Sequence, residues 1–267
     1  MVMKLDIYHV DSFTEKLFGG NPACVVRLDE WLPDDIMLKI AGENAVAETA
    51  FFICKEDFFL LRWFTPDIEM DLCGHATLAA AHIVRTVVGW KEKVITFDTA
   101  AGKLGVIFSG GIYYMALPSR PATQRELPEI IAGSLSIQPN EVLKARDYIL
   151  VYHSEEDIRN ITINRLMFDR INLGQGGVAV TAPGRNCDFV SRFFTPQATI
   201  LEDYVTGSAH CTLIPYWSAR LGRRTLVGEQ ISSRPGRLYC EDAGAKVRVG
   251  GSAVTYFAGE LILDGFI

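Results

Sequence analysis

Side chains that could carry chemistry gather in three short segments of the chain. The first contains a lone carboxylate, Glu48, among small and apolar residues. A carboxylate removed from water is a better general base near neutral pH. The other two segments combine acids with a thiol, an imidazole or hydroxyls: Asp71, Cys73 and His75 in one, and Glu202, Asp203, Thr206 and Ser208 in the other. These side-chain types favour proton transfer on a small ligand. The competing interpretation of Glu48 is a carboxylate on an edge strand that points to water.

Two apolar runs follow the second and third segments. Each begins after one glycine and ends before another, with the same spacing (89 − 74 = 15 and 222 − 207 = 15): Gly74 to Gly89, and Gly207 to Gly222. Each run predicts a buried helix with a glycine C-cap, over residues 75–88 and 208–221. Pro215 should kink the second helix.

Both predicted helices start beside polar side chains. A helix N-terminus has unpaired N–H groups and partial positive charge, so it attracts anions, and a glycine there lets a ligand approach the backbone. Two such starts that face each other across one cleft would form a binding site for a small anion. In the alternative interpretation, Asp71, Thr206 and Ser208 only cap the helices.

The two helices belong to a longer internal repeat. Phe64-Thr65-Pro66 recurs as Phe194-Thr195-Pro196, an offset of 194 − 64 = 130, and Gly102-Lys103-Leu104 is matched by Gly236-Arg237-Leu238, an offset of 236 − 102 = 134. Landmarks in the same order at nearly constant offsets predict two lobes of similar fold. We expect the boundary near residues 117–121, where two prolines interrupt a strand-like run. The lobes are then residues 1–118 and 119–267, and the last strands can pack back on the first lobe.

Most other segments are predicted as strands, because β-branched and aromatic residues lie between turn signals. The predicted strands cover residues 23–28, 50–54, 58–64, 94–97, 104–108, 112–117, 171–173, 178–181, 188–194, 237–240, 246–249 and 253–257. Many strands with one buried helix per half predict an α+β fold. Each lobe should be a strongly curved, mostly antiparallel sheet wrapped around a central helix.

Composition argues against several other classes of protein. Hydrophobic residues make up 49% of the 267 residues, so a packed core can form. Lys and Arg number 26 against 32 Asp and Glu, a net charge of −6, which argues against nucleic acid or an anionic membrane as a partner. No stretch reaches the roughly 20 apolar residues of a membrane-spanning helix, and the first residues lack the pattern of a signal peptide. We therefore expect a cytoplasmic globular protein.

Metal and nucleotide sites lack their usual sequence patterns. The six cysteines are scattered without a Cys-x-x-Cys, and no histidine pair has helical spacing, so we expect no metal and reduced thiols. Gly174-Gln175-Gly176-Gly177 is glycine-rich like a phosphate loop, but no helix or Lys-Ser/Thr follows it, so nucleotide binding is not expected. His210 is a candidate for a supporting position behind Ser208. The other histidines, His9, His82 and His153, are expected in the core or on the surface.

The reactive segments resemble those of the phenazine-biosynthesis PhzF-like isomerase family. The similar motifs are Gly20-Asn21-Pro22-Ala23, Glu48-Thr49-Ala50-Phe51, Asp71-Leu72-Cys73-Gly74-His75-Ala76-Thr77-Leu78-Ala79 and Glu202-Asp203-(x2)-Thr206-Gly207-Ser208-Ala209-His210, and the match runs from about Asp6 to Gly259. The resemblance implies the diaminopimelate epimerase fold, in which two pseudo-symmetric lobes, each a β-barrel around a central helix, enclose the active site. It also implies a cofactor-independent isomerase or epimerase, usually a homodimer, that acts on a small carboxylate-bearing metabolite.

The resemblance further implies roles for individual residues. The family's proton-transferring glutamate corresponds to Glu48, its supporting histidine to His75, its aspartate to Asp203 and its serine to Ser208. Backbone amides around the two helix-starting glycines would hold the substrate carboxylate or the enolate that it becomes. The implied substrate-binding residues are Asn21, Cys73, Gly74, Ala76, Thr206, Gly207 and Ala209.

The leading hypothesis is an isomerase in which Glu48 takes a proton from carbon and returns it elsewhere, while Asp203, His75 and the helix amides stabilise the developing charge. The first alternative is an amino-acid epimerase or racemase that uses Cys73 as one base, although the counterpart of Cys73 in the second half is Thr206. The second alternative is a non-catalytic protein that binds small acids, because the family often has a serine where this chain has Ala47.

Overall fold

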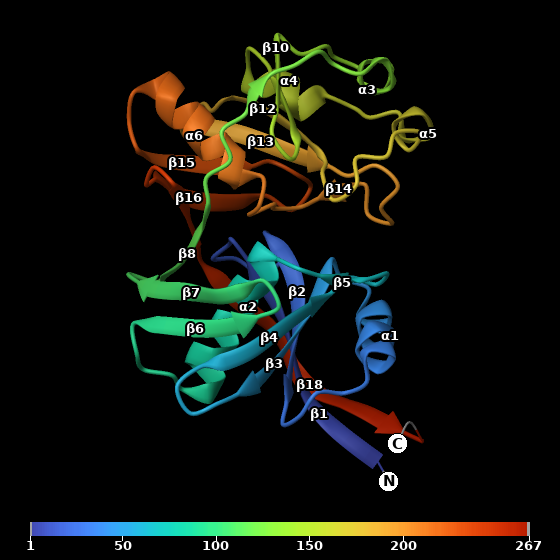
Figure 1. The fold of residues 1–267 in the computed structure, drawn as a ribbon, viewed down its shortest axis with the longest axis vertical. Coiled ribbons are helices and arrows are strands. Elements are labelled where there is room, and N and C mark those ends of the chain that lie inside the picture. Colours follow the sequence, from blue (N-terminus) through green and yellow to red (C-terminus); the bar gives the residue numbers. More distant parts are fainter. Residues whose placement is uncertain (1, 266–267) are drawn as a thin grey trace. The chain divides into compact units, whose positions relative to one another are not determined.

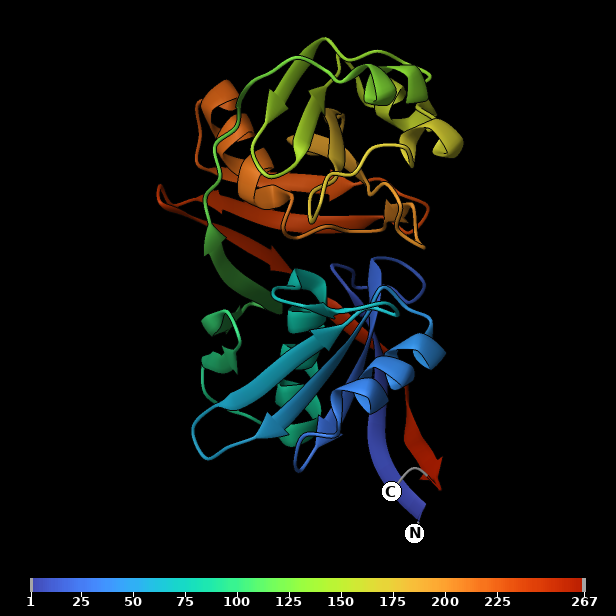
Figure 2. The same ribbon diagram turned by 45° about the vertical axis from the view of Figure 1, so that its right-hand side comes forward.

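The computed structural model of the chain describes residues 2–265 and contains two compact units (Figures 1 and 2). The first unit comprises the described part of Met1–Ala116 and Gly250–Ile267, and the second comprises Leu117–Val249. In this division the C-terminal strand, β18 (Ala253–Asp264), packs back on the first unit. That strand belongs to the first unit because it pairs along its length with the N-terminal strand, β1 (Val2–Ser12).

The first unit is a mixed sheet with two main helices. Its remaining strands are β2 (Asn21–Leu28), β3 (Glu48–Cys54), β4 (Phe59–Phe64), β5 (Glu69–Met70), β6 (Val94–Thr99), β7 (Gly102–Ser109) and β8 (Ile112–Pro118). Its helices are α1 (Asp34–Asn44) and α2 (Gly74–Ile83), and α2 continues into the π-helical turn η1 (Val84–Val88). Within this unit the pairs β2–β3 and β4–β6 are parallel, and the other described pairs are antiparallel.

The two helices cover opposite faces of this sheet. Side chains alternate between the faces of a strand, and Phe51 of β3 packs in one core with Met37 and Ile40 of α1. The alternate positions of β3, which include Glu48, lie on the other face, where α2 packs against β1, β2, β3 and β18. Every residue of α2 except His82 is buried. Figure 2 shows α1 and α2 on either side of β3 and β4.

The second unit combines its strands with one long helix and three short ones. Its strands are β9 (Thr123–Gln124), β10 (Glu141–Lys144), β11 (Tyr148–Val151), β12 (Val178–Pro183), β13 (Phe189–Phe194), β14 (Glu202–Asp203), β15 (Thr225–Gln230), β16 (Gly236–Asp242) and most of β17 (Lys246–Gly251). Its helices are α3 (Glu129–Ser134), α4 (Glu155–Asn160), α5 (Arg165–Phe168) and α6 (His210–Leu221). The long helix is anchored by Trp217, which stacks on Phe189 at 5.8 Å and donates from Nε1 to Thr181 Oγ1 at 3.0 Å.

Element order and strand pairing recur in the two units, which confirms the internal repeat. The first parallel pair of strands along the chain is β2–β3 in one unit and β11–β12 in the other. The next strand, β4 or β13, pairs antiparallel with a two-residue strand, where Phe64 faces Glu69 and Phe194 faces Glu202. The strand after the buried helix, β6 or β15, then pairs in parallel with β4 or β13. Both buried helices therefore start at the same point of the repeat.

The predicted helices differ from the observed ones mainly at their ends. The first ends in the turn η1, and Gly89 has a φ of 83°, so the expected glycine C-cap is present. The second contains Pro215 and ends at Gly222, with a φ of 68°. This α-helix begins at His210 rather than at 208, because residues 207–209 form a tighter turn with hydrogen bonds between residues three apart.

One predicted strand is wrong, because residues 171–173 have no ladder partner and lead instead into the turn at Gly174. None of the helices in the described range 2–265 is both long and apolar enough to cross a membrane.

Candidate active site

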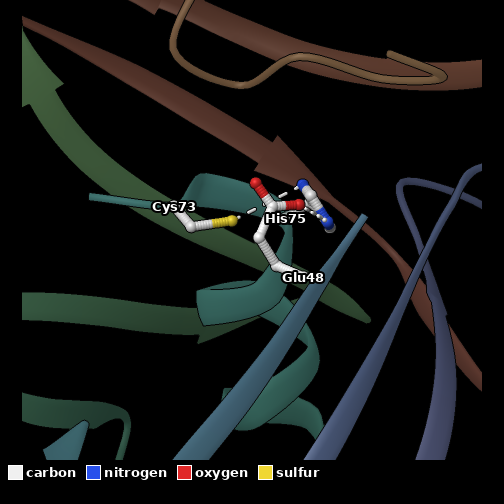
Figure 3. A group of neighbouring side chains, drawn as sticks. All are labelled: Glu48, Cys73 and His75. Atoms are coloured by element: carbon white, nitrogen blue, oxygen red, sulfur yellow. Dashed lines mark hydrogen bonds and ion pairs between the residues drawn. The ribbon is translucent and has the colours of Figure 1, made fainter. Parts of the chain in front are cut away.

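Glu48, which is half-buried, and His75, which is buried, form a pair at the start of α2 in the first unit (Figure 3). Glu48 is the first residue of β3, on the face that α2 covers, and His75 is the second residue of α2. Glu48 Oε2 lies 3.1 Å from His75 Nε2, and 16% of the Glu48 side chain and 5% of the His75 side chain are exposed. The ring N–H is not aligned with this oxygen, so the contact is an ion pair rather than a directed hydrogen bond.

Two neighbouring strand ends hold His75 in place. Asn21, the first residue of β2, places its Nδ2 3.2 Å from His75 Nδ1. Ser12, the last residue of β1 and the ladder partner of Asn21, donates from Oγ to the His75 carbonyl at 2.8 Å. In the neutral ring, Nδ1 accepts from the Asn21 amide and the proton lies on Nε2, beside Glu48; in the cationic ring both nitrogens carry protons, so the Nδ1–H needs the side-chain oxygen of Asn21 as its acceptor. The strand ends therefore set the position of the ring and, when the ring is neutral, the tautomer that faces the carboxylate.

Burial and charge act in opposite directions on His75. Burial alone would lower the pKa of the ring, but neighbouring negative charge outweighs it, and the pKa of His75 is raised well above the ordinary 6.5. Burial, followed by the charge of Glu48, raises the pKa of the Cys73 thiol. Cys73, with Sγ 3.6 Å from His75 Nδ1, and Glu48 both face the ring, and they are the neighbours that raise its pKa, Cys73 first and Glu48 second.

Glu48, Cys73 and His75 are also the side chains that could hold a metal ion. Their candidate ligand atoms all lie within 4.8 Å of one another. However, Cys73 contacts Nδ1 of the ring whereas Glu48 contacts Nε2, and one ion binds through one ring nitrogen. An ion shared by all three would require the ring to turn. The observed arrangement fits a proton-carrying pair better than a metal site.

In the second unit, Asp203 and Thr206 are joined through Gln230. Thr206 Oγ1 donates to Asp203 Oδ2 at 2.7 Å. Gln230, the last residue of β15, accepts from the Thr206 N–H at 2.8 Å and donates to the Asp203 carbonyl at 2.7 Å. The Thr206 hydroxyl, which is the counterpart of the Cys73 thiol, is therefore fixed on the Asp203 carboxylate.

Ser208 lies beside a guanidinium group. Arg146 Nη2 donates to Ser208 Oγ at 2.9 Å. The same guanidinium makes a bidentate pair with Asp147, through Nε at 3.0 Å and Nη2 at 2.9 Å. Asp147 is buried, whereas Arg146 and Ser208 are half-buried. The structure thus groups Ser208 with a charged pair from the turn between β10 and β11.

The start of each buried helix lacks a side-chain cap. The N-cap residue is Cys73 in α2 and Ala209 in α6, and neither helix has a side-chain cap hydrogen bond. The alternative in which Asp71, Thr206 and Ser208 are only helix caps is therefore wrong. The amides that precede the first helical hydrogen bonds are those of Gly74, His75 and Ala76 in one unit, and Gly207, Ser208 and Ala209 in the other. Each unit thus has a helix start suited to an anionic group.

Of the remaining histidines, His210 and His82 are uncharged near neutral pH, and His9 and His153 lie outside these groups. His210 is buried in α6 with Nδ1 2.8 Å from the Thr206 carbonyl, and burial lowers its pKa to about 4. It therefore supports Thr206 through its Nδ1–H and stays uncharged near neutral pH. Burial also lowers the pKa of His82 to about 4. His9 is half-buried beside Tyr256, and His153 is exposed.

Sequence reasoning missed Ser12, Arg146, Asp147 and Gln230. The repeat contains a signal for Arg146, because the turn between β10 and β11 corresponds to the turn before Asn21, which the family motif identified. Gln230 has no such signal. It is an isolated amide at a strand end, and its place beside Thr206 follows only from the pairing of β15 with β13.

Comparisons with known proteins agree over nearly the whole chain. A family model described as phenazine biosynthesis-like protein (PhzC-PhzF) matches residues 10–259. An uncharacterized isomerase of Pseudomonas aeruginosa is 42% identical, with 98% of this chain and 100% of that protein covered. A crystal structure of a phenazine biosynthesis protein of the PhzF family from Enterococcus faecalis is 40% identical, with a TM-score of 0.94 and coverage of 98% of this chain and 100% of that one.

A more distant likeness concerns the fold alone. A hydroxyproline epimerase from Agrobacterium vitis is 11% identical, with a TM-score of 0.63 and coverage of 98% of this chain and 94% of that one. Together with the repeated units, these neighbours confirm the predicted fold class, an α/β mixture with the diaminopimelate epimerase-like fold.

Proposed function

Because the chain belongs to the phenazine biosynthesis-like (PhzC-PhzF) family, we propose that it is an isomerase that moves a proton on a small carboxylate-bearing substrate, with Glu48 as the acid/base group. Relatives that match over their full length are named isomerases, which supports this type of reaction. The single observation that carries the mechanism is the Glu48–His75 pair, largely withdrawn from water, beside the uncapped start of α2.

Glu48 has the features of a base that takes a proton from carbon and returns it to another position. Its side chain is mostly withdrawn from water and is attached to a strand end rather than to a loop. The ion pair engages Oε2, and we assign the other carboxylate oxygen, Oε1, to the contact with the substrate. A positioned general base typically contributes about 10²- to 10⁴-fold in rate.

The other residues would stabilise charge. The ring of His75 lies against Oε2 of Glu48, and the amides around Gly74 would hold the substrate carboxylate or the enolate. We assign Asp203 and Ser208, with the amides around Gly207, to the same reaction as hydrogen-bonding groups for the remaining polar atoms of the substrate. Each of these steps uses a side chain or amide of this chain, so the proposed reaction requires no metal or organic cofactor.

The contact between Cys73 and His75 favours a second candidate, a racemase in which the thiol is one of two bases. Two observations support the glutamate mechanism over it. Burial raises the pKa of the thiol, so little thiolate is present near neutral pH. The equivalent position in the second unit is Thr206, whose hydroxyl donates to Asp203 instead of serving as a second base.

Exchange of carbon-bound protons tests the proposed function before the substrate is known. The full chain is incubated in deuterated water with a panel of small carboxylic acids, and deuterium on carbon is measured by NMR. We expect at least one acid to gain deuterium only in the presence of the protein. Acids that bind, as shown by thermal stabilisation, but never exchange would instead indicate a non-catalytic binding protein.

A further inference from the structure

The turn between β10 and β11 has the same place in the second unit as the turn between β1 and β2 in the first. Each turn joins antiparallel strands, and the second strand then pairs in parallel with the next. In the first unit, Asn21 at this turn contacts His75, the residue after Gly74. In the second unit, Arg146 contacts Ser208, the residue after Gly207. The repeat thus brings a supporting side chain to the same position of both helix starts.

Arg146 is itself held from behind. The buried carboxylate of Asp147 binds its Nε and Nη2 and accepts a third hydrogen bond from the Gly177 N–H at 3.0 Å. The neighbouring Gly176 packs so closely that a Cβ there would lie 2.8 Å from the Arg146 carbonyl oxygen, so this position requires glycine. The glycine-rich segment 174–177, which carries no phosphate-loop pattern, is therefore the support of the Arg146–Asp147 turn.

We propose that Arg146 is a positioning residue that orients the Ser208 hydroxyl as a hydrogen-bond donor to the substrate, an inference that rests on the proposed function. A guanidinium group can only donate, so its contact at 2.9 Å uses a lone pair of Ser208 Oγ and leaves the hydroxyl hydrogen for another acceptor. Asp147 balances the charge of Arg146 at short range. The effect of Arg146 is therefore on the direction of the hydroxyl, and less on the attraction of anions.

The bidentate pair makes this role specific to arginine. It fixes the plane of the guanidinium, so one Nη2 can serve Asp147 and Ser208 together. Lysine carries the same charge but has no planar fork, so it can pair with Asp147 without holding the hydroxyl. Arg146→Lys therefore keeps the positive charge but no longer fixes the direction of the Ser208 hydroxyl, and Arg146→Met removes both the charge and the contact.

The test measures kcat and KM for deuterium exchange, with an acid from the panel, in Arg146→Met, Arg146→Lys, Ser208→Ala and the double variant Arg146→Met/Ser208→Ala. We expect each single variant to lose about 10- to 100-fold in kcat with little change in KM. The double variant should be no slower than Ser208→Ala, because both changes remove one shared interaction. Arg159→Met, which removes a pair with Glu155 in α4 of the same unit, is the matched control and should keep the wild-type kcat.

Three results would overturn the inference: wild-type kcat in Arg146→Met, full recovery in Arg146→Lys, or losses that multiply in the double variant. If Arg146→Met does not fold, Arg146→Lys alone still decides, because it keeps the charge beside Asp147. Failure of the proposed function is separate, since it would appear as no exchange by the wild-type protein or as normal exchange by Glu48→Gln.

Discussion

Changing Glu48 to glutamine should lower the pKa of His75 and remove the stability that the ion pair contributes. Unit charges 3.1 Å apart attract by roughly 5 kcal/mol at an effective dielectric constant of about 20. Burial of both groups opposes this attraction, and loss of one partner from a buried pair costs about 3–5 kcal/mol. Because an amide stays beside the ring, we expect Glu48→Gln to lose about 3 kcal/mol in the free energy of unfolding near pH 6.

This loss should depend on pH with a defined sign. The pKa of His75 is raised above its ordinary 6.5 in the folded protein, so its contribution is fully present below pH 6.5 and is lost as pH rises through the folded value. In urea unfolding, the difference in the free energy of unfolding between the wild type and Glu48→Gln should therefore become smaller from about pH 6 to about pH 9. NMR titration should show a lower His75 pKa in the variant.

Glu202→Gln is the matched control for this experiment. Glu202 pairs with Arg192 at 2.7 Å, with 21% and 17% of the two side chains exposed, which is close to the burial of the Glu48 pair. Arginine does not deprotonate in this range, so the stability lost in this variant should not change with pH. Two results would refute the ion pair between Glu48 and His75. One is a His75 pKa at or below 6.5 in the wild type. The other is a difference in the free energy of unfolding between the wild type and Glu48→Gln that does not change with pH.

Three further predictions follow from the geometry. Cys73→Ser should change the exchange rate by less than about 10-fold, whereas a thiol base requires a loss of at least about 10²-fold in kcat. Burial lowers the pKa of His82 and of His210 from 6.5 to about 4, so their neutral forms are at full stability above pH 6.5. The free energy of unfolding, measured in urea, should therefore fall between about pH 6.5 and about pH 4, with a shallower fall in His82→Gln. Gly176→Ala should cost about 1–3 kcal/mol in urea unfolding and lower kcat as Arg146→Met does, because its Cβ presses on the Arg146 carbonyl.

The sequence could predict the repeat and the first half of the candidate site because both depend on local signals. Hydrophobic runs of equal length between glycines define the two buried helices, and the structure keeps both glycine C-caps. His75 lies at the helix start that the pattern locates, whereas Glu48 lies two residues before the predicted strand 50–54 and begins β3 in the structure; the two meet because β3 packs against α2. Resemblance to family motifs supplied what spacing alone left open, namely the roles of these residues.

The supporting residues of the second helix start could not be predicted, because they depend on long-range pairing. Arg146 lies 62 positions from Ser208 in the chain, and the two meet only when β11 pairs with β12. The strand predicted over residues 171–173 failed for the same reason. Its β-branched and apolar residues satisfy the local pattern, but Ile171 and Leu173 pack on the core beside Phe168 without a ladder partner.

Turnover and ligand affinity of the Glu48→Gln variant test the central claim most directly. With an acid whose carbon-bound proton exchanges in the presence of the wild type, we predict that the variant loses at least about 10²- to 10⁴-fold in exchange rate. Its Kd for the same acid should stay within a few-fold of the wild-type value, because the amide keeps the shape of the side chain. Glu241→Gln, which removes a surface ion pair with Arg248, should retain the wild-type rate. Near-normal exchange by Glu48→Gln would contradict the assignment of Glu48 as the group that moves the proton.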